Sequence, residues 1–419
     1  MDVLAAGPIV AREILKGLHP LDLRNLAKDK EVTTKFQSAT YIHRVRSRSK
    51  GALRVHGKGA WPDAERAVFD NVHRHLAAQR LIQVDLQVCA SEPTYHVRLY
   101  VPRVHADLAC MAARAMLPAP AERVRREHAE ITAIVLPEWS QEPAVLVDLA
   151  ASSACILGSD DYGDIHNSVL RLVAHQARGR GHLALHAGSV EIVARSGKTG
   201  ELNRCGLLIF GSGGAGKTTL VSHDYGLDAA SGEKTSIRQD DRVTLHPSGF
   251  VQGTQGQGLY VRTLGLSPQD RPALYAACTH EEALLENVWV NRDASIDFAS
   301  DVLTTNGRAI VPIRRIAGAD GQVDLPRCTH MVFLVRNDAL APAARIGPVR
   351  AAETFLSGEA AEAGLSAEWK QDADRLLAFL RAHPDVRCFL LNTARSGAAE
   401  AASIVRDVCR EVGDWGAGT

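Results

Sequence analysis

Residues 207–220 read LLIFGSGGAGKTTL, an apolar strand followed by a glycine-rich loop and the polar start of a helix. Gly211, Gly216, Lys217 and Thr218 fit the spacing G-x-x-x-x-G-K-[ST] of a phosphate-binding loop. Glycines let backbone N–H groups close around phosphate oxygens, and the following helix turns its positive end toward the anion. The stretch therefore predicts a nucleotide site, in preference to a glycine turn that binds nothing.

Each part of the predicted loop has an expected role in binding ATP and Mg²⁺. Lys217 is expected to reach the β- and γ-phosphates, and the Thr218 hydroxyl is expected to bind Mg²⁺. The residues predicted to surround the nucleotide are Gly211, Ser212, Gly213, Gly214, Ala215, Gly216, Lys217, Thr218 and Thr219.

Composition narrows the classes of protein to which the chain could belong. Its 419 residues predict two or three domains, and its 48 basic and 48 acidic residues give no reason to expect nucleic acid or an anionic membrane as partner. Eight scattered cysteines without a C-x-x-C pair indicate reduced thiols and a cytoplasmic location. We expect no signal peptide and no membrane span, since neither pattern occurs.

The pattern of apolar residues predicts an α/β protein. Residues 1–40 read as helical, with Pro20 opening a second helix, and 81–88 alternate as a half-buried strand does. From His182 onward, strand follows strand, which places a domain boundary near 181. We expect domains at 1–181 and 182–419, with the phosphate loop in the second. Further predicted elements are helices at 64–79, 106–116, 167–176, 367–382 and 398–412, and strands at 95–101, 131–136, 144–149 and 386–391.

Two acidic residues and a histidine are candidates for metal binding near the loop. Asp240 and Asp241 follow the loop by about twenty residues and precede an apolar strand, which suits a Mg²⁺ ligand. A solvated turn is the alternative for such a pair. His186 is expected on a strand shortly before the loop strand, where a lone histidine is more often a hydrogen-bonded core residue than a ligand.

These motifs, in this order, resemble the ATP-dependent phosphoenolpyruvate carboxykinases, and HPr kinase shares the histidine, loop and Asp-Asp part. The likeness covers roughly residues 40–395 and is strongest over 183–316. It is carried by LALHAGSV, GLLIFGSGGAGKTTL, the Asp-Asp pair, ALLENVWVNRDASIDF, TTNGRAIVPIRRI, RSRSK, CILGSDDYGDIHNS and FLSG. The resemblance implies a two-domain carboxykinase-like fold with its phosphate loop in the C-terminal domain.

The resemblance also implies roles for individual residues. His186 and Asp241 match the family's ligands for a second metal ion, usually Mn²⁺, while Thr218 holds the nucleotide Mg²⁺. Arg308 matches the arginine that touches the transferring phosphate. Arg48 matches the substrate-carboxylate arginine, and Tyr162 matches the active-site tyrosine.

The chain departs from the family pattern at the second metal. The family's metal-binding lysine aligns with Asn167, a weak neutral ligand, beside His166, which could bind a transition metal well. The acidic residue of the family's E-G-G-C-Y segment is lost in Gly256–Tyr260, and a late block with an arginine and a threonine near the nucleotide is missing after Gly358. A changed metal cage affects decarboxylation more than phosphoryl transfer.

Three functions remain open at this point. The first is an ATP-dependent phosphotransferase acting on a small anionic, carboxylate-bearing acceptor. The second is an authentic carboxykinase, which converts oxaloacetate and ATP to phosphoenolpyruvate, CO₂ and ADP. The third is a protein kinase resembling HPr kinase or a non-catalytic nucleotide-binding regulator. Retention of Lys217, Thr218, Asp241 and Arg308 together argues against a mere regulator, and Asn167 favours the first function over the second.

Overall fold

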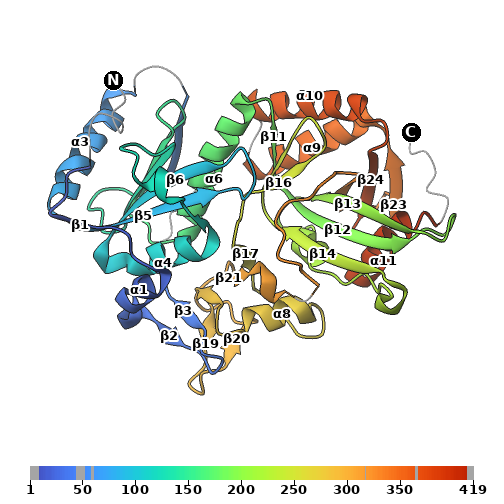
Figure 1. Cartoon of the computed structure of the whole chain (residues 1–419), viewed down its shortest axis with the longest axis horizontal. Helices are drawn as coiled ribbons and strands as arrows, with labels where there is room; N and C mark the ends of the chain where they lie inside the picture. The colour runs from blue at the N-terminus through green and yellow to red at the C-terminus, as the bar shows by residue number, and fades with distance from the viewer. Residues whose placement is uncertain (1–8, 44–51, 58–60, 317, 364–366, 413–419) are drawn as a thin grey trace.

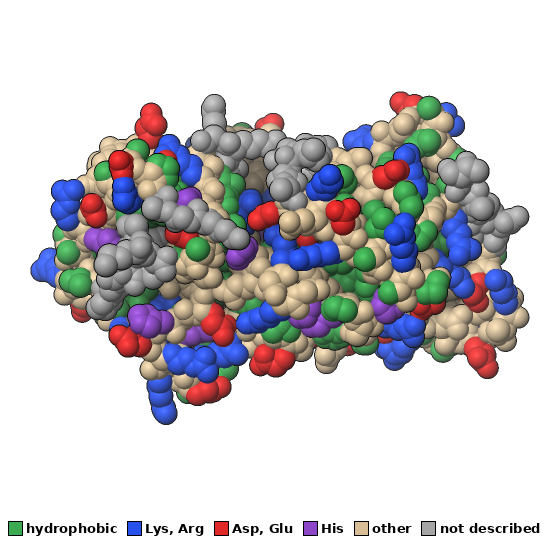
Figure 2. All heavy atoms as spheres, turned by 90° about the horizontal axis from the view of Figure 1, so that it is seen from above, with side chains coloured by type: hydrophobic (Ala, Val, Ile, Leu, Met, Phe, Trp, Pro, Cys, Tyr) green, Lys and Arg blue, Asp and Glu red, His purple; other side chains and the backbone are tan. Residues whose placement is uncertain are grey.

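A computed structural model describes residues 9–43, 52–57, 61–316, 318–363 and 367–412. Within this part the chain is a mixed α/β protein with a large sheet at each end and a smaller sheet between them (Figure 1). No helix of the described part is long and apolar enough to cross a bilayer. On the face seen in Figure 2, basic and acidic side chains are interspersed.

The first large sheet is built only from residues that precede 158. Its strands run in the order β1-β5-β6-β8-β10-β9-β4, with β7 paired to β5. Helices cover both faces, since α4 and α6 contribute to one apolar cluster and α3 to another. The bounds are β1 Glu13–Leu15, β4 Leu53–His56, β5 Arg80–Val88, β6 Tyr95–Pro102, β7 Leu117–Pro118, β8 Ile131–Leu136, β9 Ala144–Asp148, β10 Ser153–Leu157, α3 Asp63–Ala77, α4 Ala106–Ala115, α5 Ala121–Val124 and α6 Tyr162–Gly179.

The second large sheet carries the glycine-rich loop. Its order is β14-β12-β13-β22-β24-β23, and β13, β22 and β24 are parallel. Helices α7 and α11 pack on one face and α9 and α10 on the other. The bounds are β12 Ala187–Arg195, β13 Leu202–Phe210, β14 Lys234–Gln239, β22 His330–Val335, β23 Ala343–Ile346, β24 Arg387–Asn392, α7 Lys217–Val221, α9 Pro348–Ala363, α10 Ala367–Ala382 and α11 Ala398–Cys409.

A five-stranded sheet joins the beginning of the chain to its second half. Its order is β17-β21-β18-β3-β2, so β3 near residue 40 pairs with β18 near residue 285. The bounds are β2 Val32–Thr33, β3 Ala39–Tyr41, β17 Gly258–Arg262, β18 Leu284–Glu286, β21 Arg308–Pro312, α1 Pro20–Leu26 and α8 Pro272–Cys278. Smaller units are β11 Leu183–Leu185 with β15 Val243–Leu245 and β16 Val251–Gly253, and β19 Trp289–Val290 with β20 Ile296–Asp297.

Several elements differ from the sequence predictions. Residues 1–40 are not helical throughout, because β1, β2 and β3 take part in sheets and only α1 begins at Pro20 as predicted. Pairing with distant strands overrides the local helical pattern there. Helix α6 begins five residues before the predicted start, where the Asp161 side chain accepts a hydrogen bond from the Gly163 N–H and caps it. The domain boundary near 181 stays a prediction.

Candidate functional site

The glycine-rich loop connects the end of β13 to the start of α7, in the predicted order of strand, loop and helix. Gly214 and Gly216 have φ of 84° and 99°, in the left-handed region that favours glycine. A Cβ on Gly211 would lie 3.0 Å from Cβ of Leu334 on the neighbouring strand. The glycines are therefore required by the path of the backbone as well as by the motif.

Asp240 lies beside the first turn of α7. Thr218 Oγ1 donates to Asp240 Oδ2 at 2.8 Å, and Asp240 Oδ1 is buried without a hydrogen-bond partner among the described residues. Burial raises the pKa of Asp240 to about 6, against the opposing effects of Lys217 and the Thr218 hydroxyl. An unpartnered carboxylate oxygen beside a threonine hydroxyl has the oxygen donors that Mg²⁺ prefers.

Asp241 lies between two histidines from different elements. His166 of α6 places Nε2 3.2 Å from Asp241 Oδ2, and His186, in the break between β11 and β12, places Nε2 3.3 Å from Oδ1. Burial alone would raise the pKa of Asp241, but the hydrogen bonds with His166 and His186 bring it well below its usual value. The structure thus brings three of the predicted metal residues together.

Asn167, the fourth candidate, does not join this group. It follows His166 on α6, and its side chain is exposed whereas His166 is 2% exposed. Consecutive residues of a helix point about 100° apart, so one of the two had to face away. The candidate position aligned with the family's lysine is therefore outside the cluster, and His166 takes part instead.

The three side chains form a hydrogen-bonded cluster, not a ready-made metal cage. In the described part of the chain, no three His, Cys, Asp or Glu side chains are already arranged around one point as metal ligands would be. Two imidazoles and a carboxylate nevertheless have donor atoms that suit a transition-metal ion. A metal ion bound there would require the histidines to exchange their hydrogen bonds with Asp241 for coordination.

Arg308 begins β21 and is held by stacking. Its Cζ lies 5.2 Å from the centroid of the Tyr260 ring, a cation–π contact. Among the described residues it forms no ion pair, and its buried Nε has no hydrogen-bond partner. Its positive charge helps to lower the pKa of Asp240, so the two side chains are close enough for their charges to interact. An arginine without a carboxylate partner is available for an anionic ligand.

The two remaining predicted substrate residues differ in how they can be placed. Tyr162, the first residue of α6, is fully buried with its ring edge-on to Tyr260 at 5.2 Å. Its hydroxyl has no hydrogen-bond partner among the described residues. Arg48 lies outside the described residues, so its predicted contact with a carboxylate stays a prediction.

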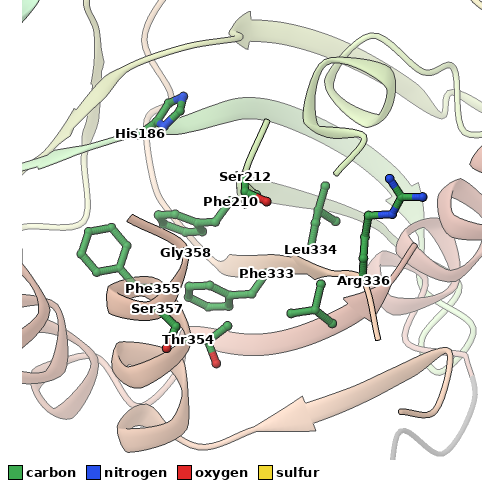
Figure 3. Close-up of a pocket in the computed structure, with 12 residues that line it drawn as sticks. His186, Phe210, Ser212, Phe333, Leu334, Arg336, Thr354, Phe355, Ser357 and Gly358 are labelled. Atoms are coloured by element: carbon green, nitrogen blue, oxygen red, sulfur yellow. The ribbon is translucent and has the colours of Figure 1, made fainter. Parts of the chain in front are cut away.

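A cavity of about 300 Å³ opens beside the loop, within the size range of small-molecule sites. Figure 3 shows His186 near one end and Arg336 at the other, with Phe355 and Thr354 contributed by α9. Its floor is apolar because Phe210 and Phe333 stack at 4.7 Å. The lining residues are His186, Phe210, Gly211, Ser212, Phe333, Leu334, Val335, Arg336, Thr354, Phe355, Ser357 and Gly358.

Comparison with known proteins identifies the family. A family model described as phosphoenolpyruvate carboxykinase matches residues 58–369, more than half of the chain. The chain belongs to the ATP-dependent phosphoenolpyruvate carboxykinase family. The mixed α/β architecture is consistent with that assignment, and the resemblance noted from the sequence is confirmed.

Curated members of the family match different lengths of the chain. A protein named phosphoenolpyruvate carboxykinase (ATP) from Aeropyrum pernix is 37% identical over 240 residues, covering 56% of this chain and 48% of that protein. A protein of the same name from Bradyrhizobium sp. strain ORS 278 is 27% identical over 373 residues, covering 80% and 65%. The chain therefore spans about half to two thirds of the length of these relatives.

Three residues of the site were not predicted from the sequence. Tyr260 supports Arg308, Glu286 accepts a hydrogen bond from Tyr260, and His43 contacts Glu286. Glu286 lies in ALLENVWVNRDASIDF, and that close match to the family was the available signal. Nothing local in the sequence of His43 indicates its role, because its partners lie 64 and 243 residues away.

Proposed function

We propose that the chain is an ATP-dependent phosphotransferase that passes the γ-phosphate to a small anionic, carboxylate-bearing acceptor. The observation that carries this proposal is Arg308, whose buried Nε has no partner among the described residues and whose charge acts on Asp240 beside the loop. A chain that only bound nucleotide would need the loop and Mg²⁺ ligands, but not an arginine available to the transferring group.

The residues divide the work of phosphoryl transfer. The loop N–H groups and Lys217 hold the phosphates of ATP, and Thr218 and Asp240 would hold Mg²⁺, which offsets charge on the phosphate oxygens when bound. Arg308 stabilises the charge that develops on the transferring phosphoryl group. The cavity beside the loop offers a space of about 300 Å³ for part of a bound ligand.

Asp241, His166 and His186 would hold a second ion near the acceptor. Their nitrogen and oxygen donors fit such an ion, although the three side chains are hydrogen bonded to one another in the present arrangement. Arg48 is proposed to bind the carboxylate of the acceptor, because a guanidinium pairs with a carboxylate through two parallel hydrogen bonds.

The second candidate is the carboxykinase reaction itself, which converts oxaloacetate and ATP to phosphoenolpyruvate, CO₂ and ADP. The family match over residues 58–369 and the printed names of the relatives favour it. The exposed Asn167 at the position of the family's metal-binding lysine counts against it. In this reaction, loss of CO₂ leaves an enolate oxygen that attacks the γ-phosphorus of ATP, and the bond from that phosphorus to the β-phosphate bridging oxygen breaks.

A turnover screen separates the candidates. The purified chain is incubated with ATP, Mg²⁺ and Mn²⁺ and a set of small hydroxy- and keto-acids that includes oxaloacetate, and ADP and CO₂ are measured. ADP with CO₂ from oxaloacetate alone supports the carboxykinase reaction. ADP with a hydroxy acid and no CO₂ supports the phosphotransferase. No acceptor-dependent ADP with any acid contradicts both.

A further inference from the structure

Glu286 is the meeting point of four elements. It ends β18, is 1% exposed, and accepts hydrogen bonds from the backbone N–H of Tyr162 at 2.8 Å and from the Tyr260 hydroxyl. Its Oε1 is also 2.6 Å from His43 Nδ1, just beyond β3. A single buried carboxylate thus contacts β17, the start of α6 and the segment after β3.

Glu286 is linked to Arg308 through the side chain of Tyr260. The Tyr260 hydroxyl donates to Glu286 Oε2, which fixes the rotation of the ring. Arg308 stacks on that ring, and its Nε has no other partner among the described residues to hold it. Backbone pairing aligns Glu286 with Arg308 across β18 and β21. The orientation of the guanidinium therefore depends on a hydrogen bond that Glu286 accepts.

Through Tyr162, Glu286 also fixes α6. The hydrogen bond from the Tyr162 N–H ties the first turn of the helix to β18. His166 lies one turn further along α6, on the same side, and its Nε2 contacts Asp241. The position of His166 relative to Asp241 therefore depends on the same carboxylate.

The charge of Glu286 is maintained by His43. Burial would lower the pKa of His43, but hydrogen bonds to Asp107 and Glu286 raise it to about 10, so the imidazole is protonated near neutral pH. Its Nε2 is 2.9 Å from Asp107 Oδ2, and Lys30 Nζ is 3.0 Å from Asp107 Oδ1. The cluster alternates in sign from Lys30 through Asp107 and His43 to Glu286, which keeps an otherwise costly buried carboxylate ionised.

We infer that Glu286 is a positioning residue that sets the orientation of Arg308 through Tyr260 and of His166 through the first turn of α6. The inference rests on the proposed function for its catalytic consequence, but not for its geometry. Glu286 itself is one side chain removed from the reacting groups, so its loss should slow turnover without a matching loss of nucleotide binding.

Three variants test the inference. Glu286→Gln keeps the shape and removes the charge, and Tyr260→Phe keeps the ring beneath Arg308 but removes the hydroxyl. Glu282→Gln is the matched control, because Glu282 is paired with Arg314 and Arg315 at the surface and has no recorded hydrogen bond to Tyr260 or α6 within the described part of the chain. For each, crystal structures are solved, kcat and KM for ATP are measured, and Mn²⁺ binding is titrated with the metal alone.

We expect Glu286→Gln to lower kcat roughly tenfold to a hundredfold while KM for ATP changes less than about threefold, because misplacement of a catalytic group acts on the chemical step. Mn²⁺ binding should weaken in Glu286→Gln but not in Tyr260→Phe, which disturbs only the Arg308 branch. The double variant should lose little more kcat than Glu286→Gln alone, since both act through one hydrogen bond.

The structures decide the inference even if the wild-type chain has no turnover. A guanidinium of Arg308 displaced from the Tyr260 ring in Glu286→Gln, and in place in Glu282→Gln, supports it. An unmoved Arg308 and an unmoved His166 in Glu286→Gln overturn it. Equal kcat in Glu286→Gln and Glu282→Gln, with an active wild type, also overturns it and leaves the proposed function intact.

Discussion

Two groups of charged side chains with buried members lie close together in this molecule, and they differ in how fully their members are hydrogen bonded. Around Glu286, the charges of Lys30, Asp107 and His43 alternate in sign and each is hydrogen bonded to the next. Around the glycine-rich loop, Asp240 Oδ1 and Arg308 Nε are buried without hydrogen-bond partners among the described residues.

This difference distinguishes a group of charges that stabilises the fold from a group that is a candidate for binding and chemistry. Buried polar groups are nearly always hydrogen bonded, so a complete set indicates a group that holds elements together. An acid and an arginine with unpartnered buried atoms beside a phosphate-loop motif are the arrangement that a bound nucleotide and its metal ion would complete. The pKa values follow the same division, since partners keep the pKa of Glu286 below its usual value whereas burial raises that of Asp240 to about 6.

The largest effect is expected from Lys217→Ala. The variant removes the loop lysine that is expected to reach the β- and γ-phosphates, so turnover of ATP should fall by roughly a thousandfold or more. Initial rates of ADP formation measure the loss. Lys370→Ala, an exposed lysine on α10, should leave the rate unchanged. Equal rates in Lys217→Ala and wild type would contradict the nucleotide assignment.

The second-largest effect is expected from Arg308→Lys, which should lower kcat about a hundredfold. Lysine keeps the charge but neither stacks as a plane on Tyr260 nor offers a fork of donors to a phosphoryl group. KM for ATP should change little, because the contact strengthens in the transition state. Steady-state kinetics with Arg314→Lys as the surface control test this. A rise in KM for ATP with kcat unchanged would contradict this role and indicate that Arg308 binds ATP equally in the ground state and the transition state.

Asp240→Asn should change how the stability of the metal-free protein depends on pH. The pKa of Asp240 is raised from 3.8 to about 6 in the folded state, so folding binds its proton more tightly. This group therefore favours folding below about pH 4, and the contribution is lost as the pH rises to about 6, a change on the order of 2–3 kcal/mol.

Denaturant unfolding of the chelated protein at several pH values between 4 and 7 measures that contribution. Asp240→Asn should lack the fall in unfolding free energy that wild type shows over this interval, and Asp374→Asn, exposed on α10, should retain it. Identical pH profiles for Asp240→Asn and wild type would show that the buried oxygen has a partner in solution.

Arg48→Ala is expected to act on the acceptor alone. If Arg48 binds the acceptor's carboxylate, loss of this charged hydrogen bond should raise the acceptor's KM about tenfold or more and leave KM for ATP unchanged. Arg54→Ala, at an exposed arginine paired with Glu65, is the control. Unaltered acceptor kinetics would favour a neutral or protein acceptor.

The smallest effect is expected at Asn167. Its side chain is exposed and outside the Asp241 cluster, so Asn167→Ala should keep turnover and Mn²⁺ binding within about twofold of wild type. His166→Ala should weaken Mn²⁺ binding by about tenfold or more, because it removes a donor beside Asp241. A larger loss of Mn²⁺ binding in Asn167→Ala than in His166→Ala would indicate that Asn167, and not His166, is the ligand.

The loop and its acidic partner were predictable because their signals are local. Gly211 to Thr219 form a contiguous motif, and Asp240 and Asp241 sit at the end of a short strand. Strands such as Ile131–Leu136 were also predicted at their observed bounds. The family resemblance extended this to the pairing of His186 with Asp241, which spacing alone could not establish.

The strands and site residues that the sequence did not predict depend on contacts between distant segments, which no local pattern encodes. Residues 13–15 are a strand only because they pair with Arg80–Ile82, and β3 is a strand only because β18 lies beside it. The choice between His166 and Asn167 as a cluster residue depended on which face of α6 turns inward. His43 could not have been identified, since its partners come from α4 and β18.

The pairing of β3 with β18 has a consequence for the order in which the chain can fold. Ala39 leaves the ribosome well before its partner Leu284, which lies far downstream in the sequence. Until then β3 has an unpaired edge, and the hydrogen bonds of Glu286 with His43, Tyr162 and Tyr260 cannot form. A fragment starting at residue 182 would carry the whole glycine-rich loop, yet it would lack the imidazolium that neutralises Glu286. We therefore expect the part of the chain from residue 182 onward to complete its folding last and to fold poorly when expressed alone. The slow step should be the long-range pairing of β3 with β18.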